Sequence, residues 1–344
     1  MPDPAPTASP PPPGNESTSN RRERCIGLVL GAGGVPAHAF HVGVLAALAE
    51  FGGWDARQAA LIIGTSAGSG VSALLRAGLD PSDAYAFFQY RPMSPAGQAL
   101  YERMPTAAWD SGAHSAGGPL PASPVLALRS LLRWPPRPGL TVAGALPRGR
   151  RSPQPLGDRY GALHDGWPEQ SLWLCAVRLG DGTRVVFGRD DHPPTDVGTA
   201  VQASSAVPGF FHPVRVGDQD YVDGGVWSTT NADLTNGLGF DAVVVSAPLS
   251  TPLLLRDLPR QPSAYRAYRA YHRAVLQAET RRVRQNGTPV ITFEPTLDDL
   301  TLLSTGAIRS QASAAISEQA YAAVRRRLER DPSIATLLTA PIAA

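Results

Sequence analysis

Residues 61–70, Leu-Ile-Ile-Gly-Thr-Ser-Ala-Gly-Ser-Gly, decide how the chain is interpreted. An apolar run ends in a small-residue turn, and residues that suit a helix follow it. A buried strand, a sharp turn that carries a serine, and a helix together form a nucleophile elbow. Gly64 and Gly68 have no Cβ, which lets the strand and the helix approach closely. The stretch predicts Ser66 as a nucleophile, with the Ala67 N–H at the helix N-terminus, where negative charge is favoured.

Composition limits the function classes. The 344 residues suit one large domain or two small ones, and 43% hydrophobic residues can form a sizeable core. The net charge of +2 does not indicate a nucleic-acid-binding protein. The two cysteines, Cys25 and Cys175, do not make a disulfide framework, so we expect buried reduced thiols. We expect neither a metal nor a cofactor.

The N-terminal segment and the hydropathy pattern bear on location. Residues 1–20 are rich in Pro and Ser, and we expect a disordered tail there. This segment lacks the charged and apolar regions of a secretory signal. No apolar stretch approaches the roughly 18 residues of a membrane-spanning helix. We therefore expect a cytoplasmic protein.

A second glycine turn follows an apolar strand at residues 26–30. A dinucleotide-binding fingerprint needs glycines at the first, third and sixth positions, and the sixth is Pro36 here. This mismatch argues against NAD binding. Bare backbone N–H groups at Gly33 and Gly34 suit an oxyanion hole instead, because no Cβ blocks the approach of a substrate oxygen. We predict that the helix after this turn covers residues 39–51.

The remaining pattern is that of an α/β fold. Apolar strands alternate with helices, which predicts a largely parallel sheet. Long helices are expected at residues 263–285 and 311–330. Residues 91–165 look irregular, with a single predicted helix at 124–132. A long irregular stretch of this kind is a cap near the site entrance or a variable surface insertion.

A serine nucleophile needs a base. In α/β-hydrolases that base is a histidine near the C-terminus, and none of the histidines after Ser66 lies in a clear strand-to-loop setting there. His272 lies on a predicted helix beside arginines. Asp223 ends a short strand and is followed by Gly224 and Gly225, where bare backbone lets a carboxylate approach closely. The sequence leaves Asp223 as the best-placed base.

Three blocks together resemble the patatin-like phospholipase family: residues 31–45, residues 64–68, and residues 203–225 with Ala-Ser-Ser-Ala-x-Pro-Gly before Asp-Gly-Gly. The resemblance covers roughly residues 25–250. It implies an α/β three-layer sandwich with a mostly parallel central sheet flanked by helices. This domain would span residues 21–344, with the insertion at 91–165 and a C-terminal helical part from about 260.

The same resemblance implies site roles. Ser66 would be the nucleophile and Asp223 its partner in a Ser-Asp dyad. The region of Gly33 and Gly34, with Ala67, would supply the oxyanion hole. One departure stands out, because Val35-Pro36-Ala37 replaces the basic residue and final glycine of the family's glycine loop, and we expect a longer loop here. An ordinary Asp is a weak base, so we also expect partial burial to raise the pKa of Asp223.

These expectations combine into a serine hydrolase that cleaves lipid or phospholipid esters through an acyl-enzyme. Two alternatives remain open: an acyltransferase with the same dyad, and a weakly catalytic binding protein that keeps the fold. Peripheral contact with a membrane is a further expectation. Its candidates are the apolar residues 252–256 and the Tyr/Arg-rich helix at 263–285, whose tyrosines and arginines suit anionic headgroups.

Overall fold

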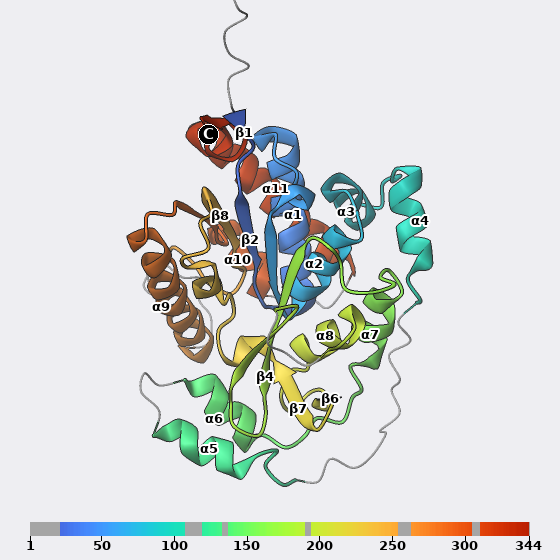
Figure 1. Cartoon of the computed structure of the whole chain (residues 1–344), viewed down its shortest axis with the longest axis vertical. Coiled ribbons are helices and arrows are strands. Elements are labelled where there is room, and N and C mark those ends of the chain that lie inside the picture. The colour runs from blue at the N-terminus through green and yellow to red at the C-terminus, as the bar shows by residue number, and fades with distance from the viewer. Residues whose placement is uncertain are drawn as a thin grey trace, which may run out of the picture.

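The structure is a computed structural model, and it describes residues 21–106, 119–132, 137–189, 194–253, 263–304 and 310–343. The expected N-terminal tail lies outside these residues, and so do Leu254, Leu255 and Arg256 of the apolar candidate segment. Figure 1 shows the chain as one body in which helices surround a central sheet.

Eight strands form the central sheet of the described chain, in the order β6-β7-β4-β3-β2-β8-β9 with β5 paired to β4. The pairings along β4-β3-β2-β8-β9 are parallel, and those of β5, β6 and β7 are antiparallel. A separate short pair joins the two ends, β1 (Arg21–Arg22) with β10 (Ile342–Ala343). The strands of the main sheet are β2 (Ile26–Leu30), β3 (Leu61–Thr65), β4 (Ser171–Arg178), β5 (Arg184–Phe187), β6 (Val214–Val216), β7 (Gln219–Asp223), β8 (Ala242–Ser246) and β9 (Val290–Phe293).

Helices cover both faces of the sheet (Figure 1). Every residue of β2, β3 and β8 is buried, as expected for parallel strands that are covered on both sides. Leu28 and Ile62 pack into one core cluster with α1, α2 and α11, whereas Val29 and Ile63 pack into a second cluster with α9. The predicted three-layer α/β sandwich with a mostly parallel sheet is confirmed. The helices on these faces are α1 (Gly34–Gly52), α2 (Ala67–Arg76), α3 (Pro81–Phe88), α8 (Val197–Ser204), α9 (Ser263–Gln285), α10 (Leu297–Ser304), α11 (Ser310–Arg330) and α12 (Ser333–Thr339).

Helix α1 differs from the sequence prediction in where it begins and in the length of the loop before it. It begins at Gly34, not at residue 39, so Val35-Pro36-Ala37 form its first turn and not an extended loop. Proline is tolerated in a first turn, where its missing N–H has no helical partner to lose. By length and composition alone α1 could also span a membrane, which is weak evidence because 61% of the tested window is buried inside the protein. Helix α11 packs so closely against α1 that a Cβ on Gly43 would lie 2.1 Å from the Ser317 carbonyl oxygen.

Residues 91–165 are more helical than predicted. Besides the expected helix, which is α5 (Pro124–Leu131), the stretch contains α4 (Pro95–Arg103), α6 (Pro138–Ala145) and α7 (Gln154–Gly161). The expectation of a single helix is wrong because proline was taken as a breaker, although Pro95 and Pro138 each begin a helix. Ser94 and Ser123 cap α4 and α5 with side-chain hydrogen bonds.

Candidate active site

The long strand β4 brings the two predicted catalytic residues to one place. Residues 171–175 of β4 pair with β3, and this pairing ends with Thr65 opposite Cys175. Residues 176–178 pair with β7, beginning with Asp223 opposite Ala176. Strand β5 pairs with residues 174–177 of β4, which overlap both of these segments. Strand β5 must therefore lie along the opposite edge of β4 from β3 and β7. Strands β3 and β7 therefore meet end to end, and the residues at their carboxyl ends, Ser66 and Asp223, converge.

Ser66 occupies a strained turn between β3 and α2. Its φ of 54° and ψ of −120° are unusual for a residue with a side chain. Such a conformation persists only where its surroundings hold it, and here both backbone groups are bonded. The Ser66 N–H donates to the Ser204 Oγ at 2.9 Å, and the Ser66 carbonyl accepts from the Ser69 N–H at 2.8 Å. Ser204 in turn donates to the Cys175 carbonyl at 2.7 Å.

Two glycines make this turn possible, as predicted. A Cβ on Gly68 would lie 2.0 Å from the Leu30 carbonyl oxygen, and a Cβ on Gly64 would lie 2.6 Å from the Ser72 Oγ. Both distances are far shorter than a carbon–oxygen contact allows. The helix after Ser66 thus packs directly against the neighbouring strand β2, and α2 begins at Ala67 with its first N–H groups beside the serine.

The carboxylate of Asp223 accepts a hydrogen bond from the Gly225 N–H at 2.7 Å. The Ser66 hydroxyl lies close enough to this carboxylate to affect its pKa. Both side chains are buried, with 6% of Ser66 and 5% of Asp223 exposed. Burial raises the pKa of Asp223 to about 6, while the nearby Ser66 hydroxyl and the Gly225 N–H lower it. The expected rise in this pKa is confirmed, and burial is more complete than predicted. Gly224 is required here too, since its Cβ would lie 2.3 Å from the Cys175 carbonyl oxygen.

The glycine turn after β2 is held by groups from distant segments. The Gly31 N–H donates to the Ser246 carbonyl at 3.0 Å, and the Ala32 N–H donates to the Thr229 carbonyl at 2.7 Å. His41, which is fully buried, reaches the Gly31 carbonyl with Nε2 at 2.7 Å and the Ser246 Oγ with Nδ1 at 2.7 Å.

Beyond these anchors the chain turns through Gly33 (φ 146°) and Gly34 (φ 65°) into α1. The first N–H groups of α1 have no intrahelical acceptor. Gly34 and Val35 are exposed, so this helix start faces solvent.

The serine turn, the glycine turn and the Asp223 turn touch one another. A Cβ on Gly68 would lie 2.9 Å from the Gly31 carbonyl oxygen, and one on Gly225 would lie 3.3 Å from the Ala32 Cβ. The N-termini of α1 and α2 therefore lie side by side at the carboxyl edge of the sheet. Backbone donors and two helix dipoles at one edge favour a negatively charged oxygen beside Ser66. The predicted residues Gly33, Gly34 and Ala67 all belong to these two helix starts.

The histidines whose side-chain contacts are known serve other parts of the fold. His41 binds the glycine turn, His164 Nε2 lies 3.0 Å from the Ala73 carbonyl, and His272 Nδ1 lies 3.3 Å from the Thr229 Oγ1. His272 is 5% exposed, which differs from the surface or half-buried position expected on its helix. Burial lowers the pKa of His272 to about 4. None of these three contacts involves Ser66.

Helix α9 uses two of its arginines inside the protein. Arg269 is 2% exposed and donates to the carbonyls of Pro248 and Ser250 at 3.0 and 2.9 Å, and Arg273 donates to the Leu253 carbonyl at 2.8 Å. These two side chains therefore hold the segment after β8.

Tyr268, on the same helix, is close enough to Asp223 for the carboxylate to contribute to its pKa. That pKa is raised to about 12, mainly by burial. Tyr268 remains 45% exposed, and its ring packs on His272 with ring centroids 4.3 Å apart. Tyr268 of α9 thus lies within electrostatic range of the candidate base.

Sequence reasoning missed several supporting residues. Ser204 lies inside the quoted block 203–225, yet its bond to the Ser66 N–H depends on α8 packing against the sheet. Asn231, at φ 55°, donates to the Thr65 Oγ1 at 3.1 Å, so it braces the residue before Ser66. Glu279 of α9 accepts from Thr230 at 2.7 Å, and burial raises the pKa of Glu279 to about 7. The sequence signal for Thr230 and Asn231 was the polar run at residues 228–231, shortly after Asp-Gly-Gly.

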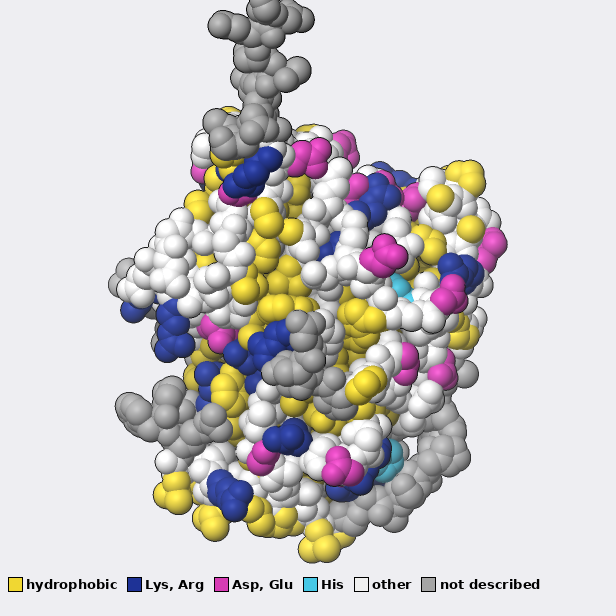
Figure 2. Space-filling model, viewed as in Figure 1, with side chains coloured by type: hydrophobic (Ala, Val, Ile, Leu, Met, Phe, Trp, Pro, Cys, Tyr) yellow, Lys and Arg dark blue, Asp and Glu magenta, His cyan; other side chains and the backbone are white. Residues whose placement is uncertain are grey.

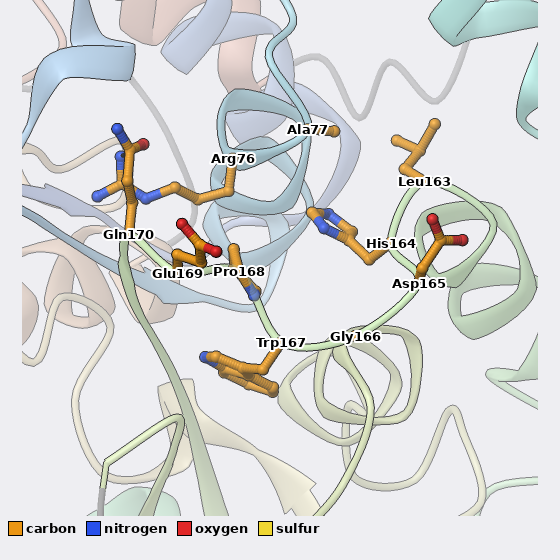
Figure 3. A pocket seen from close by; sticks show the side chains of 10 residues that line it. All are labelled: Arg76, Ala77, Leu163, His164, Asp165, Gly166, Trp167, Pro168, Glu169 and Gln170. Atoms are coloured by element: carbon orange, nitrogen blue, oxygen red, sulfur yellow. Dashed lines mark hydrogen bonds between the residues drawn. The ribbon is translucent and has the colours of Figure 1, made fainter.

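Two other kinds of site are a metal centre and a ligand pocket. Within the described ranges, no cluster of three or more His, Cys, Asp or Glu residues could hold a metal ion. A pocket of about 530 Å³ lies between the end of α2 and residues 163–170 (Figure 3). Residue 170 directly precedes β4, whose start pairs in parallel with the start of β3, so this pocket lies at the edge opposite Ser66. Arg76 in its wall is occupied with the carbonyls of Ala59 and Ser171.

Comparisons with known proteins cover solved structures, curated proteins and a family model. Among solved structures, VipD from Legionella pneumophila is similar over 90% of this chain and 67% of its own, at 13% identity and a TM-score of 0.43. The type III effector protein ExoU is similar over 91% of this chain and 56% of its own, at 16% identity and a TM-score of 0.37. The chain thus spans little more than half of ExoU. A search of curated proteins found no match. The family model for patatin-like phospholipases matches residues 28–235, which is more than half of the sequence, and the chain therefore belongs to the patatin-like phospholipase family.

Proposed function

We propose that the protein is a serine lipid acyl hydrolase that works through a Ser66–Asp223 dyad. The observation that carries this proposal is the meeting of the buried Ser66 and Asp223 side chains at the carboxyl ends of two strands that both pair with β4. Membership of a phospholipase family supports ester hydrolysis as the general activity. The pKa of Asp223, about 6, suits a base that must accept a proton near neutral pH.

In the first half of the reaction, the Ser66 Oγ attacks the ester carbonyl carbon while its proton passes to Asp223. The resulting oxyanion accepts hydrogen bonds from the N–H groups of Gly33 and Gly34, with Ala67 as a third donor. Loss of one such donor typically lowers turnover by about 10²–10³. The carbon–oxygen bond to the leaving alcohol then breaks, and Asp223 returns the proton to that alcohol.

In the second half, a water molecule attacks the acyl-enzyme carbonyl. Asp223 accepts a proton from the water, and the same N–H groups stabilise the second oxyanion. Breaking the Ser66 ester returns the proton to Oγ and releases the carboxylic acid. If an alcohol takes the place of water, the same steps give an acyltransferase. We propose a cytoplasmic location with peripheral membrane contact.

The test is labelling by a fluorophosphonate, which reacts with activated serines. We expect labelling of the wild type, none of Ser66→Ala, and a loss of at least about 10³-fold in labelling rate for Asp223→Asn. Ser82→Ala is the matched control, because this exposed serine lies on α3, outside the serine turn. A folded wild type that resists labelling would favour the binding-protein alternative. Unchanged labelling of Asp223→Asn would remove the dyad.

Hydrolysis assays across a panel of lipid esters then distinguish substrates. Phospholipids, lysophospholipids and neutral glycerides differ in headgroup charge and in acyl position. Adding a primary alcohol to the assay separates the two transfer reactions, because an acyltransferase would form the new ester at the expense of the free acid. A predominance of free acid supports the hydrolase.

A further inference from the structure

Helices α5 and α6 form a close pair, here named the α5–α6 hairpin, that is fastened to the sheet beside the candidate site. A Cβ on Gly144 would lie 2.5 Å from the Ala127 nitrogen, so the two helices touch. The Ser130 Oγ and Thr141 Oγ1 lie 2.8 Å apart across the pair. This close packing makes the hairpin one rigid unit.

The inner face of the hairpin is apolar and buried. Leu126 and Leu140 are each 1% exposed, and they form a separate core cluster with Val177, Leu179 and Val222. Val222 is the residue before Asp223. The hairpin therefore rests on the strands that carry the candidate base.

A second attachment lies just past Asp223. Arg137, at the N-cap position of α6, donates to the Trp227 carbonyl at 2.7 Å, and its guanidinium lies 4.2 Å from the centre of the Trp227 ring. A Cβ on Gly139 would lie 2.3 Å from the Val226 carbonyl oxygen. Whatever binds the outer side of the hairpin is thus held near the segment that follows the catalytic candidate.

The outer face of the hairpin is also apolar, but it is exposed. Figure 2 shows hydrophobic side chains along the edge of the molecule where Figure 1 places α5 and α6. Positions 125, 128 and 132 share one face of α5, because residues three and four apart are neighbours on a helix. The large apolar side chains of this surface are more than half exposed: Leu120, Val125, Leu128, Leu131, Leu132 and Val142. A solvated helix normally places polar residues on its outer side.

The charge of this stretch narrows the choice of partner. Residues 111–157 contain no Asp or Glu, and their only charged residues are six arginines. Arg129 lies among the exposed leucines of α5 and is itself exposed. Two of the other arginines have partners inside the protein, since Arg137 is bound to Trp227 and Arg148 pairs with Asp220. Exposed leucines around an exposed arginine such as Arg129 suit an anionic membrane, where apolar side chains enter the acyl boundary and cations contact headgroups.

We propose that the outer face of the α5–α6 hairpin is the surface by which this protein docks on anionic lipid bilayers. The inference deepens the proposed function, on which it rests for its purpose: docking would bring the Ser66–Asp223 site to membrane esters. It moves the expected membrane contact from α9 and residues 252–256 to a different part of the chain.

The test is vesicle co-sedimentation of full-length Ser66→Ala protein, so that lipid is not consumed. Vesicles of phosphatidylcholine alone are compared with phosphatidylcholine mixed with phosphatidylglycerol. We expect binding to the anionic vesicles that weakens at high salt. The L128Q/L131Q double variant should bind at least about tenfold more weakly, and Arg129→Gln about fivefold. Leu297→Gln is the matched control, since Leu297 is 50% exposed on α10, away from the hairpin.

Three results would overturn the proposal: no binding of the parent protein to anionic vesicles, equal binding by the double variant, or a loss of binding in Leu297→Gln as large as in the double variant. A dimer in sedimentation equilibrium that the double variant abolishes would assign the surface to a second copy instead. Thermal unfolding of each variant checks that exposed substitutions leave the fold intact. Fluorophosphonate labelling is read separately, so failure of the hydrolase proposal with intact vesicle binding remains distinguishable from failure of the docking surface.

Discussion

The serine turn and the glycine turn lie side by side at one edge of the sheet, but they are held in different ways. The serine turn depends on the close approach of α2 to β2 and β3, which Gly64 and Gly68 permit, and it also receives hydrogen bonds from Ser204 and Asn231. The glycine turn is held by Thr229, Ser246 and His41, which come from later segments or from the helix it begins. Both turns use hydrogen bonds from distant residues, but the closest backbone approach is at the serine turn.

The two turns should differ in the substitutions that they tolerate. A side chain added at Gly68 meets backbone atoms, which cannot move aside without shifting a central strand. A side chain added at Gly34 meets nothing nearer than the Pro36 Cδ, at 3.9 Å. Gly68 should therefore resist substitution sterically, whereas Gly34 should resist it only through backbone conformation; at Gly33 a Cβ would also lie 2.7 Å from the Ala37 Cβ.

The largest expected effect is that of Gly68→Ala. Its Cβ would lie 2.0 Å from the Leu30 carbonyl oxygen and 2.5 Å from the Leu30 carbonyl carbon, so β2 or α2 must shift. We expect a loss of at least about 4 kcal/mol in the free energy of unfolding, or failure to fold. Urea denaturation of the purified variant measures it. A loss below about 1 kcal/mol would show that the contact between the turns is looser than described.

The pH dependence of activity separates the titrating groups of the two turns. Asp223 must be ionised to act as a base, and its pKa is raised to about 6, so kcat/KM for a soluble ester should fall about tenfold per pH unit below pH 6. Burial lowers the pKa of His41, in the glycine turn, to about 4. Activity that persists to pH 4 and falls only there would point to His41 and away from Asp223. Intrinsic fluorescence at each pH establishes that the protein is still folded.

The smallest expected effect is that of Gly34→Ala. Its φ of 65° strains an alanine by about 1–2 kcal/mol, and no atom blocks the new methyl group. Comparison with Gly68→Ala in the same urea titration gives the contrast between the turns directly. Equal losses in the two variants would contradict it.

The sequence predicted best what depends on neighbouring residues. The turn at Ser66 and α9 follow from glycines and periodicity within a short window. Asp223 was identified from Asp-Gly-Gly, and its burial explains its raised pKa. The starts of α1, α4 and α6 were misjudged because proline in a first turn resembles proline that breaks a helix.

What the sequence could not predict involves residues far apart in the chain. Nothing near Ala32 indicates that the Thr229 carbonyl will accept its N–H, and nothing near Ser66 indicates Ser204. The exposed outer face of α5 was equally hidden, because apolar residues on both sides of a helix normally indicate a buried helix. These features depend on how strands and helices assemble.

The end-to-end meeting of β3 and β7 has a consequence for the order in which the protein matures. Ser66 and Asp223 are 157 residues apart, and most of that interval must be folded before β7 can align on β4. Contacts between residues far apart in the chain form late in folding, because closing the loop between them costs conformational entropy before the contact can stabilise the chain. A nascent or partly folded chain already displays its serine but lacks the base. With the proposed dyad, ester hydrolysis would be withheld until the sheet is complete, without a separate inhibitor.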